Sequence, residues 1–425
     1  MSANREDVEF VMLGIPDVNG SLRGKAMRPD AFTSALQHGS AMTDLLLALD
    51  PVDTPIGDYE EFGIRSGAAD LIVRPETQTL QYLSWRPRWQ VCIGTPFWPD
   101  GTRCELSSRE VLRAAVSQMS DLGYDVLAAL EYEVRVRDAQ SGRFASSGIS
   151  YSLAELGGLA AFVARLRPAL EGLGVELTAI HTEAAPGLLE LNLAARPALQ
   201  AGDDATYTKL AAKEVAATLG LTATFLAKTA PGEEGSSGHV HFSCWRDGRN
   251  AFVDATVMGA AVAGVLDHLP AASLLLNPTL NSYKRLIPGF FAPTNVSWGL
   301  ENRSAALRAI RSGRDELTRI ECRRPGADAN PYLALAAIVV SAADGLRRGA
   351  APPEPVKGDA YARGDLKPLP TSLESALTAF AEDGVLRNGI GERFCAYFAT
   401  SRRWELKAWQ NAVTDWERER YERSV

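Results

Sequence analysis

The chain has 425 residues, of which 46% are hydrophobic and 23% are charged, a composition that excludes a disordered or fibrous protein. Its formal net charge of −8 argues against a nucleic-acid or membrane-surface partner, because such proteins carry basic patches. Five scattered cysteines without a Cys-x-x-Cys motif argue against a disulfide framework and favour a cytoplasmic protein. No signal peptide is evident, and the apolar stretch from Tyr332 to Leu346 is too short to cross a membrane.

Strands and turns dominate the first 104 residues. The segment "VEFVMLGIPDVNGSLRGKAM" alternates around Asn19–Gly20, a dipeptide typical of a hairpin turn. The segments "DLIVRPE" and "WQVCIGT" predict further short strands. We therefore expect a small N-terminal domain that ends near Cys104, where a helix signal begins.

A larger second domain is predicted for residues 105–425, in which strands and helices alternate. Its first helix is predicted to begin with a capping box of Ser107 and Glu110 and to end at Gly123. One further helix is expected in "LAELGGLAAFVARLRPALEGLG" and another around "KLAAKEVAATLG". The intervening strands are "DVLAALEYEVRV", "VELTAIHTE", "LLELNLA" and "TATFLAK", and the tail from Leu373 to Tyr421 is predicted to be helical.

Acidic residues recur at period two on these apolar strands. Glu131 and Glu133 share one face of "LEYEVRV", because alternate side chains of a strand point the same way. Glu183, Glu190 and Glu321 stand in similar surroundings. A salt bridge or an exposed strand face explains any one of them, but five inward carboxylates together require cations. Oxygen ligands with one imidazole favour Mg²⁺ or Mn²⁺ over zinc.

Two histidines and a group of arginines complete the pattern. His239 and His241 are expected to share one face of a strand in "EGSSGHVHFS", although two half-buried structural histidines explain that pair equally well. Arginine forks bind phosphate and carboxylate groups, so arginines beside divalent metals indicate phosphoryl transfer. The C-terminal half provides Arg285, Arg303, Arg308, Arg319 and Arg323.

Seven motifs in order make the chain resemble the glutamine synthetase family of the long bacterial type. They are "EYE", "HTEAAPGLLE", "GSSGHVHFS", "NPTLNSYKRLIPGF", "NRSAALR", "RIECRRPGADANPYLALAA" and "VTDWERERY". The resemblance implies an α+β fold, with a small β-grasp-like domain at 1–104 and a larger α/β catalytic domain at 105–425. A curved antiparallel sheet in the larger domain is expected to form a funnel. A homo-oligomer is also implied, a dodecamer of two hexameric rings with sites between subunits.

The same resemblance implies a role for each site residue. One Mg²⁺ or Mn²⁺ ion is matched to Glu133, Glu183 and Glu190, and a second ion is matched to Glu131, His239 and Glu321. The residues matched to ATP are His241, Ser243, Arg308 and Arg319. Arg303 and Arg323 are the catalytic arginines, and Arg303 stabilises the transferring phosphoryl group. The substrate-binding residues are Gly235, Arg285, Arg323 and Phe291.

The chain departs from the family in the flap over the site. Ammonia-using members have an acid in G-[FY]-E-A-P that takes a proton from ammonium, where this chain has Phe291 in "GFFAP". A phenyl ring offers a cation–π face or an apolar wall, but no base. A neighbouring acid in place of the lost one is the alternative interpretation. The chain also departs from the family pattern at Glu234, Thr182 and Leu188. The N-terminal acid that helps to bind ammonium in the family has three candidates here, Asp50, Asp53 and Asp58.

Intact metal and phosphate residues beside an altered ammonium site favour an ATP-dependent ligase that joins the γ-carboxylate of glutamate to a small organic amine. The intermediate would be a γ-glutamyl phosphate. One alternative is an ammonia-dependent glutamine synthetase, and another is a catalytically weak paralogue with a role in regulation or assembly. Six complete metal ligands weigh against the paralogue, because unused buried carboxylates are costly to keep together. The sequence does not name the amine.

Overall fold

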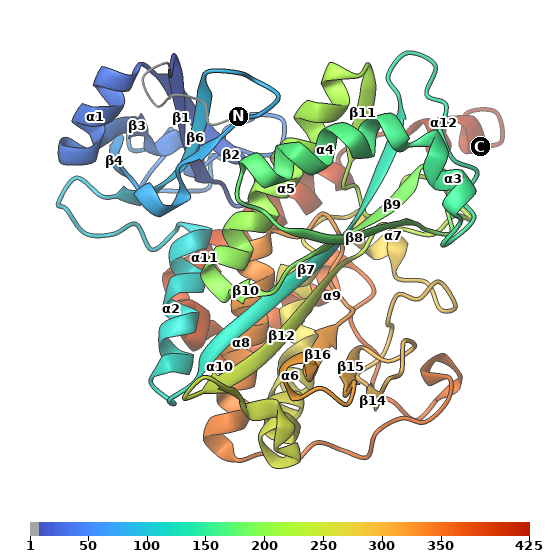
Figure 1. Ribbon diagram of the computed structural model, residues 1–425. Helices are drawn as coiled ribbons and strands as arrows, with labels where there is room; N and C mark the ends of the chain where they lie inside the picture. The colour runs from blue at the N-terminus through green and yellow to red at the C-terminus, as the bar shows by residue number, and fades with distance from the viewer. Residues whose placement is uncertain (1–7) are drawn as a thin grey trace.

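The computed structural model describes residues 8–425 and is a mixed α+β fold with two sheets (Figure 1). The N-terminal sheet has six strands in the order β2-β1-β6-β4-β3, with β5 paired to β6. Strands β1 and β6 run parallel, whereas the other pairs are antiparallel. The strands are β1 Phe10–Pro16, β2 Leu22–Met27, β3 Ser40–Thr43, β4 Asp70–Pro75, β5 Gln81–Tyr82 and β6 Trp89–Phe97.

The predicted hairpin at Asn19–Gly20 joins β1 to β2. Gly20 has a φ of +81°, a conformation that glycine adopts without steric cost. Helix α1, Pro29–His38, packs on β4 and β1 and buries Phe32 there. One face of this sheet therefore has its own small core, while its other face joins the main core of the molecule. The predicted domain boundary near Cys104 lies between β6 and α2 and stays a prediction.

The second sheet has ten strands and curls into a half-barrel (Figure 1). Its order is β14-β15-β16-β12-β7-β9-β8, with β10 and β11 paired to β7 and β13 paired to β12. Only β14 and β15 pair in parallel. The strands are β7 Asp125–Asp138, β8 Leu177–Thr182, β9 Leu188–Leu193, β10 Arg196–Pro197, β11 Leu221–Thr224, β12 Gly238–Arg246, β13 Arg249–Asn250, β14 Trp298–Leu300, β15 Leu307–Ile310 and β16 Arg319–Cys322.

Helices, including α6 and α8, pack together in the core of the same domain. The buried helix expected around Tyr332–Leu346 is α8, and it packs closely against α6, which the sequence analysis did not identify. Glycine is required at their contact, because a Cβ on Gly264 would lie 2.2 Å from the carbonyl oxygen of Ser341. The helices are α2 Ser108–Ser120, α3 Leu153–Gly158, α4 Ala160–Gly172, α5 Ala198–Thr218, α6 Ala255–Leu276, α7 Ser282–Arg285, α8 Pro331–Arg348, α9 Leu373–Glu382, α10 Gly384–Ile390, α11 Glu392–Gln410 and α12 Asp415–Tyr421.

Helix α6 is the one described helix that is long and apolar enough to cross a membrane. Within its most apolar stretch, however, 83% of the residues are buried inside the protein. Its apolar character is thus explained by its packing against α8 and α9.

Two local predictions were wrong. The Ser107 side chain makes no capping hydrogen bond, and the Glu110 carboxylate pairs with Arg103 and Arg113 instead of completing a capping box. The single helix expected after residue 152 is two helices, α3 and α4, which meet at Leu159. The helix predicted around "KLAAKEVAATLG" is confirmed as α5, which begins earlier, at Ala198.

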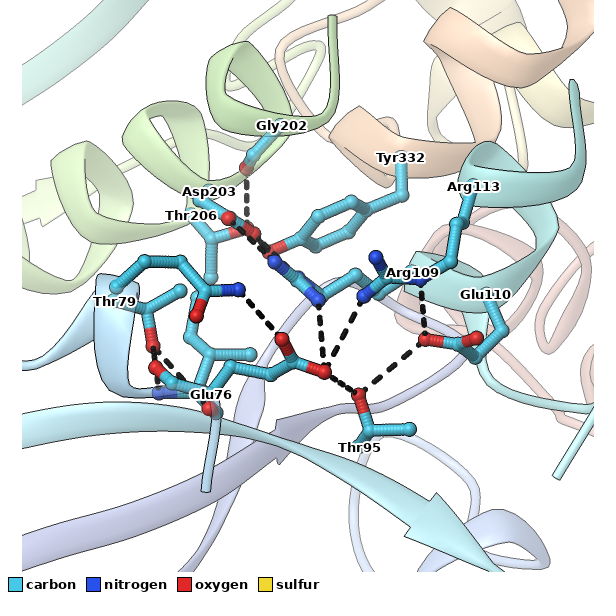
Figure 2. Close-up of polar contacts among 12 residues, drawn as sticks. Glu76, Thr79, Thr95, Arg109, Glu110, Arg113, Gly202, Asp203, Thr206 and Tyr332 are labelled. Carbon is cyan, nitrogen blue, oxygen red and sulfur yellow. Dashed lines mark hydrogen bonds and ion pairs between the residues drawn. The ribbon is translucent and has the colours of Figure 1, made fainter. Parts of the chain in front are cut away.

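A buried polar cluster links the N-terminal sheet to helices α2, α5 and α8 (Figure 2). Arg109 of α2 donates two hydrogen bonds to Asp203 of α5, at 2.8 and 2.9 Å. The Tyr332 hydroxyl of α8 donates to the same carboxylate at 2.8 Å. On the sheet side, Glu76 accepts from Thr95 at 2.5 Å and lies 3.8 Å from Arg109. The bidentate geometry fixes the position of α2 relative to α5 and α8.

Candidate active site

A polar cavity of about 550 Å³ lies against strands β7, β9, β12 and β16. Alternation along β7 explains its chemistry, because Leu130, Tyr132 and Val134 are buried in the core while the residues between them face the cavity. All six predicted metal ligands line this cavity: Glu131, Glu133, Glu183, Glu190, His239 and Glu321.

Sheet register brings the first group of ligands together. Glu190 on β9 stands opposite Glu133 on β7 and opposite His181 on β8. The His181 Nε2 atom lies 3.0 Å from a Glu190 oxygen, and its Nδ1 atom lies 3.2 Å from Glu183. Burial opposes the charge of His181, but hydrogen bonds to Glu183 and Glu190 raise its pKa to about 10. The ring of Tyr151 stacks on this imidazole at 4.0 Å.

Sequence reasoning missed His181. Its only signal is its position two residues before Glu183 on a predicted strand, which places both side chains on one face. The compact group is His181, Glu183 and Glu190, whereas the predicted set contained Glu133 in place of the histidine.

Glu133 differs from the other carboxylates of its set in its contact with the backbone. Its side chain accepts a hydrogen bond from the backbone N–H of Ser237 at 2.6 Å. Burial, together with the charge of Glu190, raises the pKa of Glu133 to about 7. A carboxyl group under this repulsion gains stability from any cation that enters the cavity.

The second group forms on the neighbouring strands. His241 stands opposite Glu321 across β12 and β16, and its Nε2 atom lies 2.9 Å from Glu131. The Nε of Arg319 donates to the Nδ1 of His241 at 3.1 Å, so the proton of a neutral His241 ring sits on Nε2, facing Glu131. The compact group is thus Glu131, His241 and Glu321, with His241 in the place predicted for His239.

His239 remains close to this group. Its Nδ1 atom lies 3.6 Å from Glu131 and 3.4 Å from Glu321, and neither ring nitrogen makes a hydrogen bond among the described residues. Burial and the charge of Arg323 lower the pKa of His239, which keeps the imidazole neutral and able to bind a metal. Burial opposes the charge of Glu321, but the positive charge of Arg323 is the largest opposing effect, and the pKa of Glu321 is lowered to about 2.

These donor sets fit hard divalent cations. Each set offers several carboxylate oxygens and an imidazole within one cavity, the chemistry that Mg²⁺ and Mn²⁺ accept. The orphaned nitrogens of His239 and the raised pKa of Glu133 are both relieved by a bound cation.

Three predicted arginines surround the carboxylates that are predicted to bind metal. Arg303 lines the cavity and forms no ion pair with the residues that the structure describes. Arg308 donates to Glu301 at 2.7 Å and to Glu321 at 3.2 Å. Arg323 pairs with Glu321. Of the three, Arg303 is therefore the guanidinium that is ready to receive an anionic ligand.

Arg285 lies at the inner end of the cavity and is only 1% exposed. One of its terminal nitrogens donates to the carbonyl of Pro325 at 2.8 Å, while Nε and the other terminal nitrogen have no partner among residues 8–425. Gly235 lies against this side chain, since a Cβ there would stand 2.7 Å from an Arg285 carbon. The unpaired donors fit a carboxylate bound beside Gly235.

A second cavity of about 430 Å³ adjoins the first and shares Glu131, Ala179 and Asn192 with it. Three of the residues predicted to bind ATP line it, and the fourth, Arg308, lines the first cavity. Its apolar walls suit a flat heterocycle, and the boundary that it shares with the first cavity includes Glu131, one of the predicted metal ligands. The three residues are His241, Ser243 and Arg319.

The structure also shows where the flap residue and the three N-terminal acids lie relative to the cavity. Phe291 lines the first cavity and is 55% exposed. Asp50 caps its own loop through the backbone N–H groups of Val52 and Thr54, and Asp53 pairs with Arg23. None of Asp50, Asp53 and Asp58 lines the cavity of its own chain.

Comparison with known families decides the relationship. Residues 105–421 match the glutamine synthetase catalytic domain. The chain belongs to the glutamine synthetase family. It is accordingly an ATP-dependent carbon–nitrogen ligase, since members of the family are glutamate–ammonia or glutamate–amine ligases that use ATP and divalent metals.

Several relatives cover nearly the whole chain. A γ-glutamylethanolamide synthetase of Streptomyces coelicolor is 33% identical over 97% of this chain and 92% of its own length. A glutamate–isopropylamine ligase of a Pseudomonas species is 31% identical over 98% and 95%, respectively. The glutamine synthetase of Thermotoga maritima is also 31% identical, over 98% and 97%.

Solved structures agree with the fold. The structure of GmaS without ligand superposes with a TM-score of 0.86 and covers 99% of this chain and 98% of its own. The two sequences are 26% identical. The half-barrel and the N-terminal β-grasp domain expected from the sequence are thus confirmed.

Proposed function

We propose that the protein joins the γ-carboxylate of glutamate to an organic amine, through a γ-glutamyl phosphate formed from ATP. The observation that supports an organic amine is Phe291, which lines the cavity at the flap position where ammonia-using members have an acid. Two of the relatives are named for organic amines, ethanolamine and isopropylamine, which agrees with this proposal.

The first step requires neutralisation of the transferring phosphoryl group. Bound Mg²⁺ or Mn²⁺ ions, held by the six predicted ligands, would supply charge neutralisation. An oxygen of the γ-carboxylate attacks the γ-phosphorus of ATP, and ADP leaves. The unpaired Arg303 guanidinium stabilises the negative charge on the phosphoryl oxygens in the transition state.

The second step consumes the acyl phosphate. The amine nitrogen attacks the acyl carbon, the C–O bond to phosphate breaks, and the nitrogen loses a proton. Arg285 and the backbone near Gly235 hold the amino-acid end of glutamate in place during both steps. Fixing the reacting groups in this way lowers the entropic part of the barrier.

We also propose that the site is completed by a neighbouring subunit in a dodecamer of two hexameric rings. Asp50, Asp53 and Asp58 lie away from the cavity of their own chain, and Val52 in the same loop is 82% exposed. Burial of this loop against another subunit would bring one of its acids to a neighbouring site.

A phosphate-release screen tests the proposed reaction. Purified protein is given ATP, Mg²⁺ and glutamate with a panel of alkyl, hydroxyalkyl and aryl amines, and with ammonium. We expect faster phosphate release with at least one organic amine than with ammonium. Ammonium as the only effective substrate would instead support an ordinary glutamine synthetase, the second candidate, which the similarity to the Thermotoga maritima enzyme favours.

A further inference from the structure

We infer that Glu234 binds the positively charged head of the amine substrate and accepts its proton. Glu234 would thereby replace the acid that the flap lacks at Phe291. The inference rests on the proposed function, because it concerns the second substrate of the same reaction.

Glu234 lines the active-site cavity together with the flap residues Phe290 and Phe291. It lies in the loop between β11 and β12 and is half-buried. Its carboxylate forms no hydrogen bond or ion pair with any residue of the described chain, 8–425. The adjacent acid, Glu233, is different because it pairs with Arg135 at 2.6 Å.

The backbone at Glu234 is held firmly. Buried Arg135 donates to the Glu234 carbonyl at 2.9 Å and to the Pro186 carbonyl at 3.0 Å. The N–H of Ser236, two residues later, donates to the Ala227 carbonyl at 2.8 Å. An unpaired carboxylate on a fixed backbone is preorganised for a cationic ligand, since no existing contact must be broken.

Charged side chains surround Glu234 in the cavity. Burial raises the pKa of Glu234, and the nearby charges that act on it are those of Glu183, Lys228 and Arg135. Arg285, which we assign to the amino-acid end of glutamate, is instead influenced by Glu133, Asp328 and Arg323. Glu234 lines the cavity together with Glu183 and the flap residues Phe290 and Phe291, a position suited to an amine that enters under the flap.

An alkylammonium ion fits these surroundings. Its nitrogen would pair with the Glu234 carboxylate, while its carbon atoms would contact the aromatic rings of Phe290 and Phe291. One proton then passes from nitrogen to a Glu234 oxygen, and the freed lone pair attacks the acyl carbon. The C–O bond to phosphate breaks, phosphate leaves with that electron pair, and the new amide nitrogen releases a second proton to water.

Glu234→Gln tests this role, because the amide keeps the shape of the side chain but neither attracts a cation nor accepts the proton. Three nucleophiles are compared: the best amine of the screen, ammonium, and hydroxylamine, which is largely uncharged at neutral pH. We expect kcat/KM for the cationic amine to fall by about 10²-fold, while hydroxamate formation from hydroxylamine changes by less than about threefold. The KM for glutamate should stay unchanged.

Glu233→Gln is the matched control. It removes the same charge one residue away, and glutamine still accepts a hydrogen bond from Arg135. We expect this variant to retain the wild-type preference among the three nucleophiles. An equal loss in Glu233→Gln and Glu234→Gln would overturn the inference, since net charge rather than Glu234 itself would then be responsible.

The outcomes separate this inference from the proposed function. If the wild type makes no hydroxamate from ATP, glutamate and hydroxylamine, the acyl-phosphate reaction itself is wrong. If the wild type makes hydroxamate but Glu234→Gln uses the cationic amine as well as the wild type does, Glu234 has no role with the amine. A raised KM for glutamate, or an equal loss with hydroxylamine, would place Glu234 at an earlier step and also overturn the inference.

Discussion

At the scale of single residues, the site is defined by which charged groups have partners. Glu131, Glu321 and His241 form a close group before any cation enters. Arg303 and Glu234, by contrast, line the same cavity without a partner among the described residues. Free groups of opposite sign in one cavity are suited to two ligands of opposite charge, an anionic phosphoryl group and a cationic amine.

Arg303→Lys tests the phosphoryl role. Lysine keeps the positive charge but loses the planar fork, so turnover should fall by roughly 10²-fold or more, with little change in ATP affinity. Steady-state kinetics of phosphate release, with ATP affinity measured separately, provides the check. An effect on the KM for ATP alone would contradict a role in the transition state.

Phe291→Glu tests the flap. The wild type should prefer an organic amine over ammonium by at least ~10-fold in kcat/KM, because the alkyl group recovers binding energy by burying carbon. Restoring an acid at this position should shift that ratio toward ammonium. Paired kinetics with both nucleophiles measure the ratio. Phe291→Leu is the matched control, since it changes the ring without adding a charge and should not favour ammonium.

At the scale of elements, helix packing depends on a buried ionic cluster outside the active site. The imidazole of His268 on α6 lies 2.7 Å from Asp383, which caps α10, and 3.1 Å from Asp344 on α8. Arg348 also pairs with Asp344, at 2.7 Å, and with Asp267, at 2.6 Å. His268 therefore links three helices through charge-assisted contacts.

This cluster predicts a pH-dependent stability. Burial opposes the charge of His268, but hydrogen bonds to Asp383 and Asp344 raise its pKa overall. A raised pKa contributes stability that is complete below the unfolded value of about 6.5 and is lost as the pH rises through the folded value. The pKa values of both aspartates are lowered, so their contribution holds above about pH 4 and is lost toward more acidic pH.

His268→Gln should accordingly destabilise the protein more at pH 5.5 than at pH 9.5. At pH 5.5 we expect the variant to have a free energy of unfolding about 1–2 kcal/mol lower than that of the wild type, because hydrogen bonds to a charged group are lost. Urea unfolding of wild type and variant at both pH values measures it. The same destabilisation at both pH values would show that His268 acts through packing alone.

At the scale of the whole molecule, the Arg109 cluster connects the N-terminal sheet to the body that bears the site (Figure 2). Arg109→Met leaves the Asp203 carboxylate buried without its positive partner, and only the Tyr332 hydroxyl still donates a hydrogen bond to it. Removing one partner of such a pair should cost about 3–5 kcal/mol of unfolding free energy, measured in urea.

Arg113→Met is the control for that cluster, because Arg113 is 34% exposed and its ion pairs should contribute less than about 1 kcal/mol. The double variant Arg109→Met with Asp203→Leu should lose less than the sum of the two single changes, since no charge is then left without a partner. Additive losses would show that the two side chains act independently.

Local sequence pattern determined much of the fold. The period of two placed Glu131 and Glu133 on one face of β7, with Tyr132 in the core between them. The dipeptide Asn19–Gly20 located the first hairpin, and the apolar run from Tyr332 identified a buried helix. These features depend on backbone geometry and on the partition of side chains between core and cavity. Both are determined by residues that are close together in the sequence. Seven motifs, whose order and spacing extend over most of residues 105–425, indicated the family by resemblance.

Tertiary structure alone decided which side chains meet. His181 joined Glu190 through the register of β8 and β9, and Glu110 pairs with Arg103 and Arg113 instead of completing its predicted capping box. Of the adjacent acids Glu233 and Glu234, only the first pairs with Arg135, a residue from a distant strand. Hydrogen bonds and ion pairs act over a few ångströms between segments far apart in the chain, and no local pattern records that distance.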